Sequence, residues 1–232
     1  VLRPTSIQNK PIGASFTESF PEIYGYHYGA TEPSWSDAPA GSGTVSVSGN
    51  AQSYAAIMPG GELDLNLVYQ RDSAKWVKLN YLPGTHGTLS TLSAAADVKT
   101  DASGNYYAEV IRAGAAANEG YSFAEIKTKR LVPEVTVSES PYYEFAGWII
   151  NDNGNGALDA GEQLADDATK FSADTVLTAY YRENPAYWID ILLAPYDSNT
   201  LTVPGASLNR HVKKDSLFGS VRASAETSFT GI

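Results

Sequence analysis

The chain has 232 residues, a net charge of −10 at pH 7 and no cysteine. The lack of Cys excludes disulfide bridges, thiolate metal sites and a cysteine nucleophile. Its 16 Lys and Arg against 26 Asp and Glu argue against nucleic-acid binding and against docking on anionic lipid, since both need an excess of cations. An apolar content of 43% is too high for a disordered chain, and no apolar run is long enough to insert in a membrane. Residues 1–10 lack the pattern of a signal peptide, so we expect a segment of a longer protein.

Strand patterns dominate along the chain. Period-2 alternation and runs of aromatic and branched residues predict strands at residues 44–48, 63–69, 76–82, 106–111, 175–181 and 187–193. The helix evidence is best at residues 122–130, which end shortly before Pro133. Residues 72–75 and 183–186 are expected to be linkers. We therefore predict a mainly β, α+β fold: two tandem compact modules of mostly antiparallel sheet with one or two short helices.

An internal repeat organises these elements. Residues 76–83 (WVKLNYLP) resemble residues 188–195 (WIDILLAP), 112 positions later, and residues 63–72 resemble residues 175–183 in pattern. A gap-free alignment also lays residues 11–26 on residues 133–148, with an offset of 122 that puts Tyr26 on Trp148. The three matches occur in the same order along the chain. They predict a partial or permuted module at 1–72, a complete module at 76–183 and the front part of a further module at 187–232.

One loop, residues 151–162 (NDNGNGALDAGE), fits the twelve-residue calcium loop of the EF-hand. Gly156 stands where the chain must turn sharply, and Asp152 is expected to point outward. The neutral Asn at the first position leaves two charged ligands, which predicts weak calcium binding with Kd on the order of 10⁻⁴ to 10⁻³ M. The alternative is a polar loop that binds nothing. The predicted ligands are the side chains of Asn151, Asn153, Asn155, Asp159 and Glu162 and the backbone carbonyl of Ala157.

Motifs for catalysis are missing from the sequence. His27, His86 and His211 lie far apart, which favours surface or turn positions for each of them. The chain has no zinc-protease motif, no nucleophile elbow and no phosphate-binding Gly-rich motif. A pair of catalytic carboxylates is a property of the folded structure, and no pair stands out in the sequence. The expectation is a chain without enzymatic activity.

Aromatic side chains offer a second class of candidate site. Tyr24, Tyr28 and Trp35 lie close together in the sequence, and exposed rings of this kind can stack on the C–H face of a sugar. The alternative is that such rings alternate along strands and fill the core. For Tyr26 the alignment with Trp148 favours the core.

Residues 143–148 (YEFAGW) and 174–181 (DTVLTAYY) resemble the Listeria–Bacteroides type repeat, which carries a Y-x-F-x-G-W element and ends in D-x-T-L-x-A-x-W/Y. Residues 78–89 resemble its opening strand and turn. The resemblance covers residues 76–183, and 11–72 and 187–232 more loosely. It implies β-grasp-like modules, similar to internalin B-repeats and mucin-binding-like modules, on extracellular, wall-anchored proteins of Gram-positive bacteria. It supplies no catalytic residues, and it implies structural roles for Gly147 and Trp148.

These observations lead to one main functional expectation and two alternatives. The main one is a non-enzymatic repeat segment of a bacterial cell-surface adhesin, a stalk or spacer with an adhesive role whose partners include neighbouring modules of the same chain. The first alternative is a dedicated module that binds host glycan or extracellular protein. The second is an accessory domain of a secreted glycan-degrading enzyme. A spacer should repeat one surface in every module, whereas a binder should carry a patch that only one module has.

Overall fold

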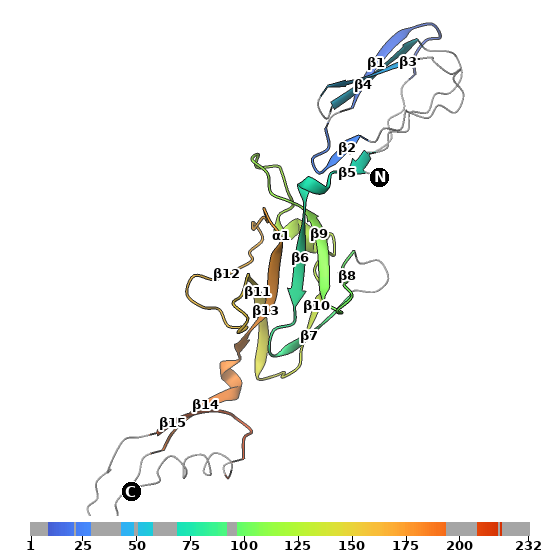
Figure 1. Ribbon diagram of the computed structural model, residues 1–232. Coiled ribbons are helices and arrows are strands. Elements are labelled where there is room, and N and C mark those ends of the chain that lie inside the picture. Colours follow the sequence, from blue (N-terminus) through green and yellow to red (C-terminus); the bar gives the residue numbers. More distant parts are fainter. Residues whose placement is uncertain are drawn as a thin grey trace, which may run out of the picture. The chain divides into compact units, whose positions relative to one another are not determined.

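The computed structural model describes residues 9–20, 22–28, 43–48, 51–57, 69–91, 97–193, 208–217 and 219. The fold is mainly β, with antiparallel sheets and little helix, as the sequence predicts (Figure 1). Residue contacts divide the chain into two compact units. The first comprises residues 1–77, 109–121 and 170–173, and the second comprises residues 78–108, 122–169 and 174–232.

The first unit contains two small sheets near its amino-terminal end. Strands β1 (Ser15–Phe20), β4 (Ala51–Ile57) and β3 (Gly43–Ser48) form an antiparallel sheet in that order. Strand β2 (Tyr26–Tyr28) pairs antiparallel with β5 (Tyr69–Arg71), which leads into the 3₁₀ turn η1 (Ser73–Lys75). The strand predicted at 44–48 is confirmed, whereas residues 63–68 of the next predicted strand lie outside the described residues.

A six-stranded sheet holds the strands predicted between residues 76 and 183. Its centre pairs the first of these strands, β6 (Trp76–Leu82), in parallel with the last, β13 (Thr175–Glu183). A parallel pair needs a crossover, and the chain between them supplies the other four strands and the helix α1 (Phe123–Thr128). The order across the sheet is β12 (Gln163–Leu164), β11 (Tyr143–Ile150), β13 (Thr175–Glu183), β6 (Trp76–Leu82), β9 (Tyr106–Ile111) and β8 (Lys99–Thr100).

Two further antiparallel pairs belong to the second unit. Strand β7 (Gly87–Ser90) pairs with β10 (Glu134–Val137). After a second 3₁₀ turn, η2 (Pro185–Tyr187), strand β14 (Trp188–Leu193) pairs with β15 (Leu208–Lys213). Strand β14 confirms the strand predicted at 187–193 almost to the residue.

The helix predicted at 122–130 is confirmed in a shorter form. Ser122 caps α1 with its side chain, and the Glu125 carboxylate accepts a hydrogen bond from the Ser122 backbone, which completes a capping box. Phe123 and Ile126 bury the inner face of this helix. So short a helix depends on that packing, because isolated helices of this length are unstable in water.

Apolar side chains from the central strands form the core of the second unit. The Tyr81 hydroxyl donates to the Leu131 carbonyl over 2.8 Å, and burial raises the pKa of this phenol well above its usual range. Trp148 is buried and packs edge-on against Tyr81 with ring centroids 5.2 Å apart, so its predicted place in the core is confirmed. Gly147 follows a bulge in the β11–β13 pairing and has a φ of +143°, which favours glycine.

Two glycines with left-handed backbone conformations differ in the space around them. Gly84 (φ +67°) has no room for a side chain, because an added Cβ would lie 2.1 Å from the Ala179 carbonyl oxygen. Gly104 (φ +83°) shares the left-handed backbone but has open space around it. Gly104→Ala should therefore lower the free energy of unfolding by about 1 kcal/mol. Gly84→Ala should lower it by roughly 1–3 kcal/mol more, because the strand must also shift. Urea unfolding of both variants measures the difference, and equal losses would contradict the contact.

Candidate functional site

The predicted calcium loop leaves β11 and returns to β12. Asn151 has a φ of +52°, and its side-chain oxygen accepts a hydrogen bond from the Val176 backbone over 3.1 Å. Its own backbone N–H donates to the Val176 carbonyl over 2.8 Å. The side chain of Asn151 is thus engaged with the start of β13 and does not join the other predicted ligands.

Four of the predicted ligands do converge. Asn153 and Asn155 each donate a side-chain N–H to the same oxygen of Asp159, both over 2.7 Å. Glu162 accepts from the backbone N–H groups of Asn153 and Asp159, both over 3.0 Å. Each amide carries an oxygen beside its nitrogen, so a half-turn of the Asn side chains would present oxygen ligands to a cation. Ala157 lies on the same loop, with its N–H bonded to the Asn155 side chain over 2.8 Å.

Asp152 departs from the expectation that it points outward. Its carboxylate turns back onto the loop and accepts hydrogen bonds from the backbone of Gly154 (3.1 Å) and Gly156 (3.2 Å). These bonds hold the sharp turn that the sequence places at Gly156. Within the described residues, no group of three or more His, Asp or Glu side chains is placed to hold a metal. A cation in this loop would therefore depend on the amide oxygens as well as on Asp159 and Glu162.

His211 is not an isolated surface residue. Its Nδ1 lies 2.7 Å from Asp190 and its Nε2 lies 2.9 Å from Glu183, so both ring nitrogens face a carboxylate. The imidazole stacks on Trp188 with ring centroids 4.8 Å apart. Hydrogen bonds to Asp190 and then to Glu183 raise the pKa of His211, because they favour the protonated ring.

His86 is likewise paired. Its Nδ1 lies 2.9 Å from one oxygen of Glu139, and its ring stacks on Tyr143 with centroids 3.6 Å apart. The other Glu139 oxygen accepts from Lys213 over 2.6 Å. The bonds from Lys213 and His86 hold the pKa of Glu139 below its usual range. The contact partners of both histidines come from distant parts of the chain, which the sequence alone does not reveal.

The two predicted linkers are ordered turns, and they share one pattern of hydrogen bonds. We call the first junction residues 24–26, 71–76 and 112–115, and the second junction residues 141–143, 183–188 and 214–216. In the first, the Trp76 indole donates to the Gly25 carbonyl over 2.7 Å, and in the second Trp188 donates to the Tyr142 carbonyl over 3.0 Å. The side chains of Asp72 and Asn184 cap η1 and η2 in the same way.

Backbone bonds extend this equivalence. The carbonyl that accepts the indole N–H bond also accepts a bond from the backbone N–H of the capping residue. This second bond is 3.0 Å long for Asp72 and 2.8 Å long for Asn184. The last residue of each turn accepts from a later segment: Arg112 donates to Lys75 over 3.0 Å, and Lys214 donates to Tyr187 over 2.9 Å. Each junction lies within one unit, so the same local structure forms once in each.

The strand register corrects one alignment. Tyr26 is opposite Arg71 in β2–β5, and Tyr143 is opposite Glu183 in β11–β13, with Glu183 112 residues after Arg71. Tyr26 therefore corresponds to Tyr143, 117 residues later, and the offset of 122 that placed it on Trp148 is wrong. Both tyrosines pack edge-on against the junction tryptophan, with ring centroids 5.6 Å and 5.7 Å apart. Tyr26 is half-buried at the junction and does not occupy the place of a core tryptophan.

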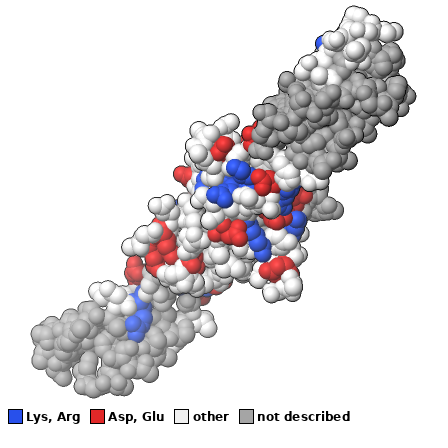
Figure 2. Space-filling model, turned by 45° about the horizontal axis from the view of Figure 1, so that its top comes forward, with Lys and Arg blue, Asp and Glu red and all other residues white. Residues whose placement is uncertain are grey.

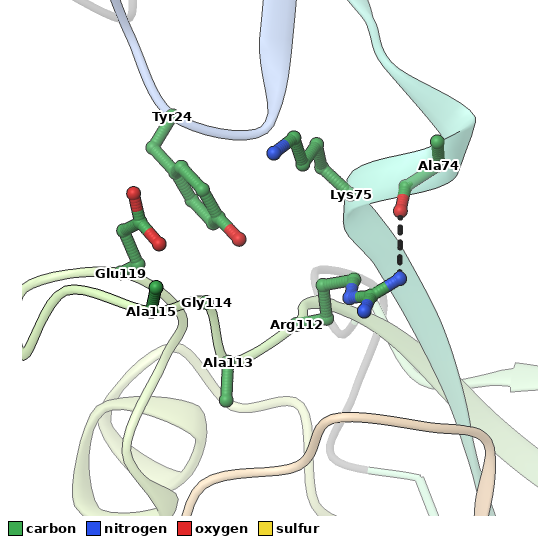
Figure 3. Close-up of a pocket in the computed structure, with 8 residues that line it drawn as sticks. All are labelled: Tyr24, Ala74, Lys75, Arg112, Ala113, Gly114, Ala115 and Glu119. Atoms are coloured by element: carbon green, nitrogen blue, oxygen red, sulfur yellow. Dashed lines mark hydrogen bonds between the residues drawn. The ribbon is translucent and has the colours of Figure 1, made fainter.

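A hollow of about 530 Å³ opens at the first junction (Figure 3). The Lys75 ammonium lies 5.0 Å from the centre of the Tyr24 ring, and Arg112 donates to the Ala74 carbonyl over 3.2 Å. Glu119 accepts from the Ala116 backbone over 3.2 Å. The residues that line the hollow are Tyr24, Ala74, Lys75, Arg112, Ala113, Gly114, Ala115 and Glu119.

Of the three aromatic residues predicted to bind a ligand, Tyr24 lines this hollow. Trp35 lies outside the described residues, and for Tyr28 the structure describes the backbone, which pairs with Tyr69. Sequence reasoning missed Lys75, Arg112 and Glu119 because two segments distant in the sequence, 74–75 and 112–119, bring them to Tyr24. On the face seen in Figure 2, basic side chains lie among acidic ones and form no continuous basic surface.

Comparisons of the chain with protein-family models, curated proteins and solved structures find no match. Among the described residues, no helix has the length and apolar character to cross a membrane. The functional argument therefore depends on the loop, the two junctions and the hollow.

The bridging position of His211 predicts a pH dependence of stability. A raised pKa in the folded state means that His211 contributes its full stabilisation below the unfolded pKa of about 6.5 and loses it as the pH rises through the higher folded value. His211→Gln should therefore lower the melting temperature more at pH 5.5 than at pH 9. Thermal melts followed by circular dichroism test this, with His27→Gln, at an exposed position of β2, as the control. A loss independent of pH would contradict the bridge.

Proposed function

We propose that the chain is a non-enzymatic repeat segment of a bacterial cell-surface adhesin, a stalk whose modules also carry an adhesive site. The observation that carries the proposal is the junction built twice with the same hydrogen bonds. A stalk needs a junction that recurs along the chain and that connects successive modules in the same way each time. In this reading, residues 1–72 form a partial or permuted module, 76–183 a complete one and 187–232 the front of a third.

The chemistry of the joint favours stiffness. One capping residue and three residues of 3₁₀ turn separate the strand that ends one module from the strand that starts the next. The side chain of the capping residue accepts a hydrogen bond from the backbone of the turn. The Trp indole N–H is a donor only, so it needs an acceptor when water is excluded. Its bond to the carbonyl of Gly25 or Tyr142 connects the turn to the neighbouring strand pair. A flexible linker would instead need several free residues rich in Gly or Ser.

The sheet topology supports β-grasp-like modules. The first and last strands of the module, β6 and β13, are parallel neighbours, and α1 follows the second long strand, β9. In the next module the pair β14–β15 corresponds to the neighbours β6 and β9. With the resemblance to the Listeria–Bacteroides type repeat, these features favour an extracellular protein anchored to the wall of a Gram-positive bacterium.

We assign the loop at 151–162 to weak calcium binding. The residues fit in part: Asp159 and Glu162 supply charge, Asn153 and Asn155 supply amide oxygens after rotation, and Ala157 can offer its carbonyl. Asn151 stays bonded to Val176, so the loop has fewer protein ligands than the full pattern. A bound ion would brace the end of the β11–β13 pair.

A dedicated binding module is the second candidate function, and one observation favours it. The first junction contains the hollow, which is lined by Tyr24, Lys75, Arg112 and Glu119. At the equivalent positions the second junction has other residue types. A pure spacer would have no reason to differ there.

Small-angle X-ray scattering tests the stalk. A compact protein of this length would have a radius of gyration of about 17 Å. We expect a clearly larger value for the 232-residue chain, and a broader range of conformations for Trp188→Ala, which removes the ring and the indole bond. Trp188→Phe keeps a ring and should fall between the two. A radius near the compact value for the unaltered chain would contradict the stalk.

Thermal melts with calcium test the loop separately. If Kd is about 1 mM, 10 mM CaCl₂ should raise the free energy of unfolding by about 1.4 kcal/mol. Glu162→Gln should abolish this gain, because it removes one of the two charged ligands. Asp167→Asn removes a charge outside the loop and serves as the control. An equal gain in Glu162→Gln, or no gain in the unaltered chain, would exclude the calcium site and leave the stalk proposal untouched.

A further inference from the structure

We propose that the hollow at the first junction binds an acidic sugar, meaning a pyranose ring that carries a carboxylate. The inference deepens the proposed adhesive role and rests on it only for the source of the sugar. The binding chemistry itself comes from four side chains of the first unit: Tyr24, Lys75, Arg112 and Glu119. Figure 3 shows the Tyr24 ring, Lys75, Glu119 and Arg112 around one open space.

Two cations give the hollow its charge. Arg112 uses one guanidinium nitrogen on the Ala74 carbonyl, and its remaining N–H groups are available for a planar carboxylate. Lys75 lies beside it along the hollow, half-buried, over the Tyr24 ring. Among the salt bridges of the described residues, neither Lys75 nor Arg112 has a carboxylate partner, although the chain has ten more acidic than basic residues. An anionic ligand would supply that partner.

The other two side chains favour a sugar over a simple anion. Tyr24 offers a half-buried ring on which the C–H face of a pyranose can stack. Glu119 is an acceptor for sugar hydroxyls, and its bond to the Ala116 backbone holds it in place. A carboxylate in an anion site would only repel a small anion, whereas it complements the hydroxyl groups of a sugar. The volume of about 530 Å³ lies in the range of small-molecule sites.

Gly114 lets two of the lining side chains lie close to the main chain. A Cβ at this position would lie 1.7 Å from the Glu119 carboxylate and 2.5 Å from the Tyr24 hydroxyl. Both atoms are the far ends of side chains, so a larger residue would push them out of their present positions without breaking the backbone. Glycine therefore lets the stacking ring and the hydroxyl acceptor approach the same point of the main chain.

The second junction has the same backbone bonds but not the same chemistry. Pro141 stands in the place of Tyr24 and Tyr187 in the place of Lys75. Lys214 replaces Arg112 and keeps its bond to the turn, with Nζ 3.3 Å from the Ala186 carbonyl. Asp215, which accepts from the Tyr142 hydroxyl over 3.1 Å, replaces Ala113 and adds a negative charge. The ring of Tyr24 and the cation of Lys75 thus have no counterpart at the equivalent positions of the second junction, where Lys213 instead lies 4.7 Å from the centre of the Tyr142 ring.

The test is calorimetric titration of the 232-residue chain with N-acetylneuraminic acid and with D-glucuronic acid. Their methyl esters and sodium acetate are the comparison ligands. We expect saturable binding of at least one acid, at least tenfold weaker binding of its ester, and no saturation by acetate. N-acetylneuraminic acid alone would indicate the ends of sialylated glycans as the source, and glucuronic acid alone would indicate uronate-containing polysaccharides.

Variants locate the binding. Arg112→Lys should weaken binding at least fivefold with an unchanged melt, because Lys214 shows that a lysine can keep the structural bond at this position. Lys75→Tyr introduces the residue of the second junction and should have a similar effect. Lys214→Ala is the matched control and should leave the affinity unchanged.

Three results would overturn the proposal: an ester that binds as well as its acid, acetate that competes with the sugar, or equal effects of the Arg112 and Lys214 variants. An absence of binding in a chain that melts cooperatively would overturn it as well. None of these results bears on the scattering test of the stalk, so the two proposals fail independently.

Discussion

The indole N–H of one tryptophan determines the geometry at each junction. Trp76 and Trp188 are half-buried, and a Trp N–H removed from water needs an acceptor. That acceptor is the carbonyl of Gly25 or Tyr142, which already receives the N–H of the cap residue. One oxygen thus joins the end of a strand pair, the 3₁₀ turn and the first residue of the next strand. If the indole bond were lost, the neighbouring aromatic contacts and the position of Lys75 would lose their support.

This backbone frame leaves its outer side chains free to vary. The frame depends on the tryptophan, on the capping Asp72 or Asn184 and on main-chain groups, and none of these needs a particular residue at position 75 or 187. Lysine at the first junction and tyrosine at the second therefore coexist with the same hydrogen bonds. Repetition of the frame is what the proposed stalk would need, and variation of its lining would let the first junction hold the proposed ligand site without weakening the second.

The sequence predicts elements well where local pattern decides them, and poorly where distant segments meet. The strands at 76–82 and 106–111 follow from their residue types, and the helix predicted at 122–130 is found in the shorter form of α1. The gap-free alignment of Tyr26 with Trp148 fails because the chain between equivalent strands differs in length by five residues, which only the strand pairing reveals. In the loop, the prediction places Asn153, Asn155, Asp159 and Glu162 correctly together. It cannot foresee that Asn151 bonds to Val176, nor that Tyr24 meets two cations from other segments.

An acidic ligand on an acidic protein is physically consistent. Exposed charges more than about 8 Å apart are largely screened at physiological salt, so the net charge of −10 has little influence inside the hollow. What decides the local potential is the pair Lys75 and Arg112, set against the single carboxylate of Glu119. The distant charges instead affect the rate of association. They repel a polyanionic chain strongly and so slow its approach, whereas they have little effect on a ligand with one negative charge. The architecture therefore favours a single acidic sugar at the end of a glycan over a densely sulfated or phosphorylated polymer.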